Sequence, residues 1–304
     1  MKISQTAVLK PQKMKALKLG LPKGSLQEST FRIFTRAGFN LNISERSYLP
    51  SIDDPRIEPV LLRAQEMSRY VEAGVLDCGI TGNDWIMENG SDVIRMAELS
   101  YSKQSLKPVR WVLAVPEESP VKSTRALEGK RIATELVNVT KSFLRKNKIR
   151  AEVEFSWGAT EVKVGAGLVD AIVELTETGR SLKAHKLREI ATVCESNTQF
   201  IANKKSYRDS FKRGKMEEIV LLLKGAITAG AMVGLKMNLR EKDLEKIVAK
   251  LPALRKPTIS SLSTKGWMAL ETVIEEKAVR RLIPELKKAG AEGIVEYPLN
   301  KVIY

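Results

Sequence analysis

Short apolar runs alternate with helical patterns along the first two thirds of the chain. Eight segments carry enough consecutive apolar residues to predict strands: 16–21, 75–80, 109–116, 130–136, 152–157, 168–175, 190–196 and 198–204. The clearest helical pattern begins at Ser25, has Glu28 three residues later, and ends before Gly38. Strands that alternate with helices are typical of an α/β fold, so we expect parallel sheets.

The pattern changes after Tyr207. One long helix is predicted from there to residue 228, and beyond Glu218 it is apolar around much of its circumference, which is typical of a helix buried between domains or subunits. Six further elements follow: strand 231–239, helix 240–251, strands 257–262 and 266–274, helix 276–290 and strand 291–299. This order is βαββαβ, the ferredoxin-like unit, so residues 225–304 are expected to form a small domain.

Composition narrows the classes of protein. The 304 residues, 43% of them hydrophobic, are enough for two or three domains with large cores. The 51 Lys and Arg against 36 Asp and Glu give a net charge of +15, which favours nucleic acid, acidic membranes or phosphorylated metabolites as partners. Residues 225–304 hold 14 basic and 9 acidic side chains, so the charge is spread along the chain rather than gathered in one nucleic-acid-binding arm.

The start of the chain and its two cysteines indicate a compartment. Residues 1–15 lack the apolar stretch of a signal peptide and are expected to be a loose basic arm. The longest apolar run, 219–235, is interrupted by Lys224 and three glycines and is too short to span a bilayer. Cys78 and Cys194 do not make a disulfide framework. We therefore expect a cytoplasmic protein that binds neither membranes nor nucleic acid.

Several kinds of catalytic site are disfavoured by what the sequence lacks. His185 is the single histidine and lies in a polar stretch, so a surface position is expected and a Ser–His–Asp triad is not. Cysteines and histidines do not have zinc-site spacing, and no residue is assigned as a metal ligand. The Walker A and GxGxxG patterns of the usual nucleotide-binding loops do not occur.

Three turns that follow predicted strands carry anion-binding chemistry. In residues 170–182, a strand with two acids opens into the turn Thr-Gly-Arg-Ser at 178–181. Glycine lets backbone N–H groups approach a phosphate, and the hydroxyls, the guanidinium and a following helix N-terminus add to the attraction. The sequences PKGS at 22–25 and GITGND at 79–84 form similar turns, and parallel strands place such turns at one edge of a sheet. Tight turns with capped helices explain the same patterns without a ligand, so both interpretations stay open.

These turns resemble the motifs of one enzyme family. PKGSL at 22–26, GITGND at 79–84 and EVKVGAGLVDAIVELTETGRSL at 161–182 are similar to the ATP phosphoribosyltransferases in their long, histidine-regulated form. The resemblance covers residues 16–304, and the third motif is the family's signature. Val137 and Gly165 depart from it at positions where proline is common, and Gly165 is expected to affect only a helix start.

The resemblance implies a fold, a reaction and a cofactor. The catalytic part is expected to have two lobes like a periplasmic binding protein, lobe I at 16–107 and 192–224 and lobe II at 108–191, with the active site in the cleft. Residues 225–304 would be an ACT-like domain that binds histidine as feedback inhibitor. The reaction joins N1 of the ATP adenine to C1 of phosphoribosyl pyrophosphate and releases pyrophosphate, the first step of histidine biosynthesis. Mg²⁺, carried largely by the pyrophosphate, and a homohexamer are also implied.

The resemblance further implies roles for single residues. The catalytic candidates are Lys23, Arg180 and Asp170. The candidates for binding phosphoribosyl pyrophosphate are Glu161, Asp170, Glu174, Thr178, Gly179, Arg180, Ser181 and Leu182. The candidates for binding ATP are Lys23, Gly24, Ser25, Arg63, Asp84, Tyr101 and Lys103, although Arg63 is as well explained by a surface ion pair with Glu58 or Glu66. The candidates for binding the regulatory histidine are Asn238, Thr258, Ser260 and Ser261.

Two other functions remain open from the sequence. A two-lobed metabolite-binding protein with an amino-acid-sensing tail and no turnover would have the same lobes, although the intact turns at 22–25 and 178–182 argue against it. A nucleic-acid-binding protein is suggested by the net charge alone. The basic clusters at 141–150 and 204–215 lack interleaved aromatic residues, which argues against that function.

Overall fold

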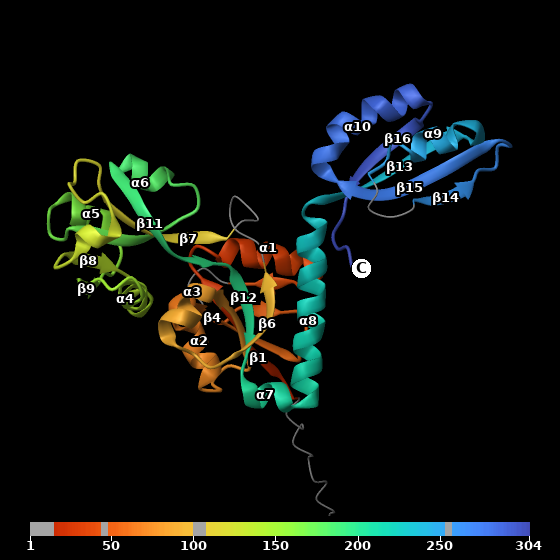
Figure 1. Cartoon of the computed structure of the whole chain (residues 1–304). Helices are drawn as coiled ribbons and strands as arrows, with labels where there is room; N and C mark the ends of the chain where they lie inside the picture. The colour runs from red at the N-terminus through yellow and green to blue at the C-terminus, as the bar shows by residue number, and fades with distance from the viewer. Residues whose placement is uncertain (1–14, 44–47, 100–107, 253–256) are drawn as a thin grey trace, which may run out of the picture. The chain divides into compact units, whose positions relative to one another are not determined.

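The structure is a computed structural model of the whole chain, and it describes residues 15–43, 48–99, 108–252 and 257–304 (Figure 1). The described residues form two compact units. The first comprises the described parts of 15–27, 40–98 and 108–216, and the second those of 28–39 and 217–304 together with Leu99. No helix in these ranges is long and apolar enough to cross a membrane. The basic arm expected at 1–15 lies outside the described residues except for Lys15.

The first unit contains two five-stranded sheets, one in each lobe. Lobe I has the strand order β4–β1–β5–β12–β6. Its elements are β1 (Leu17–Lys23), β4 (Ile57–Arg63), α2 (Ala64–Glu72), β5 (Cys78–Gly82), α3 (Asn83–Asn89), β6 (Ile94–Leu99) and β12 (Thr198–Ala202), with a small ribbon of β2 (Leu41–Asn42) and β3 (Ser51–Ile52). β1 is parallel to β4 and β5, and β12 is antiparallel to β5. Helix α1 (Gln27–Ala37) follows β1, and almost all of it is grouped with the second unit.

Two glycines let helix α2 lie close to the lobe I sheet. A Cβ atom at Gly20 would be 2.2 Å from Sδ of Met67, and one at Gly79 would be 2.7 Å from the same sulfur. Met67 is fully buried and packs in one cluster with Val71 and Ile86. The strands β1 and β5 therefore need glycine where the helix crosses them, because any side chain would displace the core methionine.

Lobe II has the strand order β11–β7–β10–β8–β9. Its elements are β7 (Val109–Pro116), η1 (Thr124–Leu127), β8 (Arg131–Thr134), α4 (Val137–Lys146), β9 (Glu152–Phe155), α5 (Thr160–Gly165), β10 (Ala171–Thr176), α6 (Arg180–Ala184) and β11 (Leu187–Ser196). β10, β8 and β9 are mutually parallel, whereas β7 is antiparallel to both β10 and β11. The carboxyl ends of β8, β9 and β10 therefore lie at one edge, and α4, α5 and α6 begin just beyond them.

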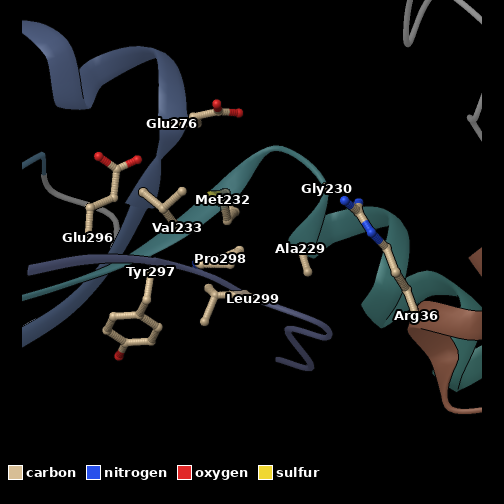
Figure 2. Close-up of a pocket in the computed structure, with 10 residues that line it drawn as sticks. All are labelled: Arg36, Ala229, Gly230, Met232, Val233, Glu276, Glu296, Tyr297, Pro298 and Leu299. Atoms are coloured by element: carbon tan, nitrogen blue, oxygen red, sulfur yellow. The ribbon is translucent and has the colours of Figure 1, made fainter.

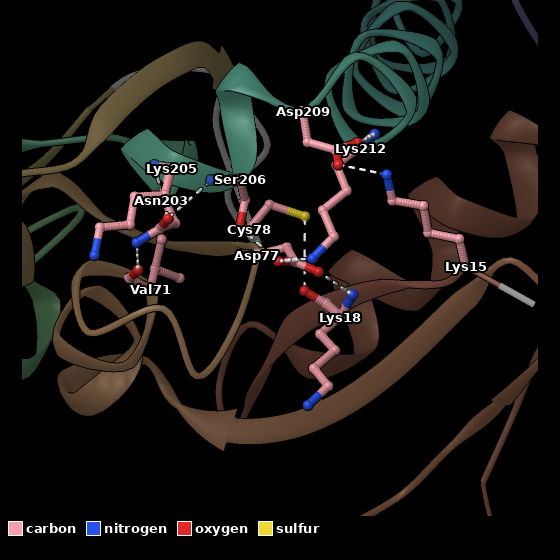
Figure 3. A network of polar contacts seen from close by, with 10 residues as sticks. All are labelled: Lys15, Lys18, Val71, Asp77, Cys78, Asn203, Lys205, Ser206, Asp209 and Lys212. Atoms are coloured by element: carbon pink, nitrogen blue, oxygen red, sulfur yellow. Dashed lines mark hydrogen bonds and ion pairs between the residues drawn. The ribbon is translucent and has the colours of Figure 1, made fainter. Parts of the chain in front are cut away.

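A polar network joins helix α7 (Lys204–Arg208) and the start of helix α8 (Ser210–Ala229) to lobe I (Figure 3). Asp77 is buried, and its Oδ1 accepts hydrogen bonds from Lys212 Nζ and Ser206 Oγ, both at 2.6 Å. Its Oδ2 accepts from the backbone N–H of Lys18 at 2.9 Å. Asn203 caps α7 and donates from Nδ2 to the carbonyls that end α2. The amino ends of β1 and β5, the end of α2 and helix α7 are thus held together by buried polar groups whose hydrogen bonds are made.

The second unit ends in a domain with the order βαββαβ. Its elements are β13 (Met232–Arg240), η2 (Glu241–Asp243), α9 (Leu244–Val248), β14 (Thr258–Ser261), β15 (Trp267–Glu275), α10 (Glu276–Ala289) and β16 (Glu292–Pro298). The antiparallel sheet has the order β14–β15–β13–β16, which is that of a ferredoxin-like fold. Alternate β13 residues, among them Leu235 and Met237, pack in one core with Leu282 and Leu286 of α10, so one face of the sheet is covered by helices (Figure 1).

The structure confirms the predicted fold class: two α/β lobes and a ferredoxin-like domain. Several local expectations need correction. β10 begins at Ala171 rather than 168, the predicted helix 207–228 is two helices that meet at Asp209, and Gly165 ends α5 instead of affecting its start. β4 and α2 were not predicted. β11 pairs with β7 as far as Ser196, so the lobe II sheet continues past residue 191.

One buried ion pair of lobe I gives a stability prediction. Lys215 is 3% exposed, and its Nζ lies 3.0 Å from Oδ2 of Asp54. Burial raises the pKa of Asp54, but the Arg56 backbone N–H and the Lys215 ammonium outweigh it, so the pKa falls from 3.8 to about 2. A carboxyl whose pKa is lowered on folding stabilises the fold above its unfolded pKa, and this contribution is lost as the pH falls through the folded value.

Lys215→Met is therefore expected to lower the free energy of unfolding by about 1 kcal/mol at pH 7, as measured by urea denaturation, because Lys215 supplies one part of the pKa shift and Arg56 the other. The difference from the wild type should shrink as the pH falls from 3.8 towards 2. Lys205→Met, at an exposed lysine, serves as the control and should leave the unfolding free energy unchanged. A pH-independent loss in Lys215→Met would show that the ion pair is not the cause.

Candidate active site

The turn after β10 forms a polar loop around one glycine. Gly179 has φ = +74°, in the left-handed region, and its N–H donates to Thr176 Oγ1 at 2.8 Å. Helix α6 begins at the next residue, and Leu182 packs in the lobe II core, which anchors the helix. The first turn of a helix leaves backbone N–H groups without helical partners, so this loop directs donors at the same edge as its side chains.

Three polar side chains surround Gly179. Thr178, Arg180 and Ser181 are exposed, and none of them has a side-chain partner among the described residues. His185 lies one turn further on, exposed as expected, with Nδ1 3.0 Å from the carbonyl oxygen of Ser181. The loop therefore presents two hydroxyls and one guanidinium to solvent without an internal counter-ion, which is the chemistry of an anion site.

Two cations lie side by side at the corresponding edge of lobe I. Lys23 ends β1 and Arg63 ends β4, and the two residues are partners in the parallel register. Neighbouring strands lie about 4.8 Å apart, so the Cα atoms of Lys23 and Arg63 are adjacent at the carboxyl ends of the two strands. Arg63 is exposed and forms no ion pair with Glu58 or Glu66 within the described chain. Lys23 Nζ lies 3.4 Å from the ring centroid of Tyr48, a cation–π contact, and the ammonium forms no ion pair with a carboxylate of the described residues.

The rest of the PKGS turn completes this edge. Gly24 has φ = +100°, and its carbonyl accepts the backbone N–H of Gln27 at 3.0 Å, so helix α1 begins two residues later than predicted. Gly24 and Ser25 are both exposed beside Lys23. The structure thus brings Lys23, Gly24, Ser25 and Arg63 together, as the sequence led us to expect of groups at parallel strand ends.

Asp84 lies in a different environment from the one predicted. Only 5% of the residue is exposed. Its Oδ2 accepts from Trp111 Nε1 at 2.7 Å, and its Oδ1 accepts from the backbone N–H of Trp85 at 3.0 Å. Burial raises the pKa of this carboxyl, while hydrogen bonds from Trp111, Ser196 and Trp85 oppose the rise. Both carboxylate oxygens are occupied, so we do not include Asp84 among the residues that touch ATP.

Of the three signature acids that are binding candidates, Glu161, Asp170 and Glu174, two lie near the lobe II edge. Glu174 is half-buried near the end of β10, and burial raises its pKa, with Glu161 and Glu135 adding to the rise. Thr160, beside Glu161 at the start of α5, hydrogen-bonds to Glu174. The acids therefore share one edge with the loop, where carboxylates can accept hydrogen bonds from sugar hydroxyls.

Asp170 lies at the opposite end of the same strand. It precedes β10, and its carboxylate accepts the Arg131 backbone N–H at 2.9 Å and pairs with Lys130 Nζ at 3.2 Å. The Arg131 N–H is the main cause that lowers the Asp170 pKa. At about 3.3 Å per residue, the strand separates Asp170 from Thr176 by about 20 Å. We therefore leave Asp170 out of the site, because it binds the amino end of β8 and cannot reach the loop.

The remaining sequence predictions are placed as follows. Tyr101 and Lys103 lie outside the described residues. In the ferredoxin-like domain, Asn238 and Ser260 are both paired with Ala269, and Thr258 lies two residues before Ser260, so these three side chains share the face that the helices do not cover. Ser261 points to the opposite face, where its Oγ lies 3.9 Å from Met268 Sδ.

A cavity of about 340 Å³ lies in the second unit (Figure 2). It is lined by Arg36 of α1, Gly230 after α8, and Glu276, Glu296 and Tyr297 of the ferredoxin-like domain. None of the predicted histidine-binding residues lines it. It therefore does not bring the four regulatory candidates together.

Two contributors to the site were missed by sequence reasoning. Tyr48 stacks on Lys23, and Thr176 holds the N–H of Gly179. Thr176 could have been found, because a hydroxyl three residues before a turn glycine is placed to accept its N–H. Tyr48 carried no signal, since it lies 25 residues from Lys23 in the sequence and reaches it only through the fold.

These features define a two-lobed α/β enzyme for phosphorylated substrates, with a cation pair on one lobe and an anion-binding loop on the other. The family profile for ATP phosphoribosyltransferase matches residues 63–225, and that for the HisG C-terminal domain matches 229–301. A curated ATP phosphoribosyltransferase of Chlorobium phaeovibrioides is 60% identical over 289 residues, covering 95% of this chain and 98% of the relative. One of Thermodesulfovibrio yellowstonii is 58% identical, covering 96% and 99%.

A solved structure supports the fold of the catalytic part. The ATP phosphoribosyl transferase (HisG:HisZ) complex from Thermotoga maritima aligns with a TM-score of 0.58 at 28% identity, over 68% of this chain and 98% of that one. The chain belongs to the ATP phosphoribosyltransferase family, and the matched C-terminal domain indicates the long form. It is a transferase that catalyses the first step of histidine biosynthesis with ATP and phosphoribosyl pyrophosphate as substrates. The family resemblance seen in the sequence is thereby confirmed. The chain is an enzyme and not the metabolite-binding protein without turnover that the sequence left open.

The loop glycine gives the second prediction. Gly179→Ala meets no neighbouring atom within 4 Å, so its cost comes from the positive φ alone. An L-residue disfavours the left-handed region, so the free loop of the variant should leave this conformation and regain it on binding at a cost of about 1 kcal/mol, which is about fivefold weaker phosphoribosyl pyrophosphate binding in calorimetry. Gly214→Ala in helix α8, which also has open space and no positive φ, is the control and should bind as the wild type does. Equal affinity in both variants would contradict a role for the loop conformation.

Proposed function

We propose that phosphoribosyl pyrophosphate binds to lobe II with its 5-phosphate in the loop 178–182. The observation that carries this proposal is the set of exposed donors around Gly179, which have no counter-ion among the described residues. Leu182 holds the loop to the core, and Arg180 supplies the positive charge. Glu174 and Glu161 accept hydrogen bonds from the ribose hydroxyls at the same edge.

Lobe I then binds the phosphates that face the loop. Lys23 and Arg63 are adjacent cations, and the exposed Gly24 and Ser25 offer a backbone N–H and a hydroxyl. We assign this group to the pyrophosphate and to the ATP phosphates. The Lys23 ammonium packs against the ring face of Tyr48. Because the ring is neutral, it does not neutralise the ammonium, and the positive charge can attract a phosphate.

The reaction itself follows from where charge develops. The N1 lone pair of adenine forms the bond to C1 of the ribose, and the bond from C1 to the pyrophosphate oxygen breaks with its electron pair on the leaving group. Attack from the opposite side inverts C1. A purine nitrogen is nucleophilic without losing a proton, so the chain needs no strong base, which agrees with the surface position of His185. Lys23 stabilises the negative charge that grows on the pyrophosphate, and Arg180 holds the ribose in line.

Mg²⁺ fits this site as part of the substrate complex. Among the described residues, no three His, Cys, Asp or Glu side chains are grouped to hold a metal ion. The oxygen ligands that Mg²⁺ prefers are supplied by the pyrophosphate itself and by water. When bound there, the ion neutralises charge on the leaving group.

The loop assignment predicts a difference between the two substrates. Arg180→Ala should weaken phosphoribosyl pyrophosphate binding by about 10- to 100-fold, because one charge-assisted hydrogen bond is lost, while ATP binding changes little. The affinities for each substrate alone are measured by calorimetry. Lys183→Ala, at an exposed lysine one turn further along α6, is the control and should retain both affinities. Equal losses for both substrates would refute the placement of the loop.

We further propose that the ferredoxin-like domain is the regulatory part and binds histidine on the sheet face that α9 and α10 do not cover. Asn238, Thr258 and Ser260 share that face and supply an amide and two hydroxyls. The relative from Thermotoga maritima is a HisG:HisZ complex, whereas this chain carries the HisG C-terminal domain. A homohexamer and a cytoplasmic location stay predictions from the long-form resemblance.

Histidine inhibition is tested by pyrophosphate release from ATP, phosphoribosyl pyrophosphate and Mg²⁺. Release should fall when histidine is added, and Asn238→Ala and Ser260→Ala should both require more histidine for the same inhibition. Ser261→Ala, on the opposite face of the same strand, is the matched control and should respond as the wild type does. Release that is insensitive to histidine in the wild type would remove the regulatory role and leave the enzyme.

A further inference from the structure

Helix α3 of lobe I is bonded to lobe II at both of its ends. We propose that this helix holds the two lobes in the orientation that the reaction needs, and that Asp84 and Glu88 act as positioning residues through it. The proposal rests on the proposed division of the substrates between the lobes. It concerns a group of contacts that takes no part in binding, buried around Asp84 and more exposed around Glu88.

At its first turn, α3 is bonded to both strands that connect the lobes. β7 is the first strand of lobe II and β11 is its last. The two strands are paired up to Val109 and Ser196, where the chain passes between the lobes. Asp84 accepts from Trp111 Nε1 of β7 at 2.7 Å, and its backbone N–H donates to Ser196 Oγ, at the end of β11, at 3.0 Å. The Asn83 N–H donates to the carbonyl of Asn197 at 2.9 Å, just beyond β11. One turn of helix is therefore bonded to the first strand of lobe II and to the end of its last strand.

At its last turn, α3 caps a helix of lobe II. The Glu88 carboxylate accepts the backbone N–H of Asn138 at 2.9 Å with one oxygen and that of Val139 at 3.0 Å with the other. The Asn138 side chain donates back to the Glu88 carbonyl at 2.9 Å. These N–H groups belong to the first turn of α4, where helical partners are lacking and the dipole favours a negative charge. The cap of a lobe II helix is thus supplied by lobe I.

Between the two ends, an aromatic pair crosses from one lobe to the other. The rings of Trp85 and Trp111 meet edge to face, with centroids 6.1 Å apart and planes at 87°. Trp85 packs against the lobe II core that contains Trp111, Leu136 and Leu144. A seven-residue helix that is fixed at both ends and packed at its middle leaves little freedom for rotation of one lobe against the other.

This arrangement matters because the proposed binding groups lie on different lobes. Lys23 and Arg63 follow strands of lobe I, whereas the loop 178–182 follows a strand of lobe II. The adenine nitrogen and C1 must come within about 3.5 Å along one line, and a misplacement of 1 Å costs up to about 100-fold in rate. A helix that sets the lobe orientation therefore acts on the rate of the chemical step rather than on the affinity for either substrate.

The test uses Trp111→Phe and Glu88→Gln in the full-length enzyme. Trp111→Phe removes the N–H that Asp84 accepts, and Glu88→Gln removes the charge and one of the two acceptors at α4. We expect kcat to fall by about 10- to 100-fold in each variant, because reacting atoms held out of line lose rate steeply. The Kd values for ATP alone and for phosphoribosyl pyrophosphate alone should stay within about twofold, since neither side chain contacts a substrate, and a twofold change is less than 0.5 kcal/mol.

Two control variants carry the same changes without the contact between lobes. Trp267→Phe makes the same substitution in the ferredoxin-like domain, where the ring centroid lies 5.1 Å from the Arg240 guanidinium carbon and the side chain has no part in the contacts of α3. Glu128→Gln alters a carboxylate that accepts the Arg150 N–H at 2.9 Å within lobe II. Both controls should retain kcat within about twofold, because the α3 contacts at both ends are left intact.

Three results would overturn the proposal. The first is a kcat within twofold of the wild type in folded Trp111→Phe and Glu88→Gln. The second is a loss of ATP affinity as large as the loss in kcat/KM, which would make α3 part of the binding site. The third is a lower Tm with an unchanged kcat per folded molecule. Arg180→Ala, measured in parallel, separates this failure from a failure of the site, because its loss of phosphoribosyl pyrophosphate binding does not depend on α3.

Discussion

The parallel pairing of strands determines where the candidate active site lies. In lobe I the register of β1 and β4 places Lys23 beside Arg63, and in lobe II the parallel strands β10, β8 and β9 end together. Parallel strands need helical connections, and each helix begins at the carboxyl edge of its strand. The backbone N–H groups at the starts of these helices therefore lie at the strand ends to which we assign the phosphates, whatever the side chains are. The glycines at 24 and 179 keep the chain close to that edge with positive φ angles.

The amount that sequence could predict depended on whether a feature was local. The strands and the TGRS turn were predictable, because the conformations of apolar runs and of turns with glycine and hydroxyl residues are determined by residues that are neighbours in the sequence. The direction of a strand was also readable, and it should have separated Asp170, at the start of β10, from Glu174 near its end. Alternation along β14 should likewise have separated Ser260 from Ser261, since successive side chains point to opposite faces.

The features that could not be predicted are made by residues far apart in the sequence. Asp84 looked like a ligand because it follows a glycine turn, and its burial depends on Trp111 and Ser196, the latter 112 residues away. Tyr48 beside Lys23 depends in the same way on the fold of the chain around it. No pattern within a short window encodes such contacts. A carboxylate in a motif is therefore assigned to a substrate only when its partners are known.

The net charge of +15 does not by itself show which cations can bind a substrate. What matters is which lysines and arginines are already paired with carboxylates of the chain. Lys212 and Lys215 are bonded to Asp77 and Asp54, and Lys130 to Asp170, so these cations stabilise the scaffold. Lys23, Arg63 and Arg180 form no ion pair with any carboxylate in the described chain. At the proposed site, no carboxylate of the described chain has to be displaced from these cations before a phosphate binds. Local availability, not total charge, is therefore the basis on which these cations are proposed as phosphate ligands.

The buried carboxylate of Asp84 is costly for stability, but it makes a directional hydrogen bond. Burying a carboxylate costs free energy, and an opposite charge beside it would recover more of that cost than neutral donors do. Here the donors are neutral, namely the Trp111 indole N–H, the Ser196 hydroxyl and the Trp85 backbone N–H, and burial still raises the pKa of the carboxyl. An apolar residue of similar size would be cheaper to bury, but it would accept no hydrogen bond from Trp111. The directional contact is what a hydrophobic side chain cannot supply, and a carboxylate at this position is what the proposed role of α3 in lobe orientation requires.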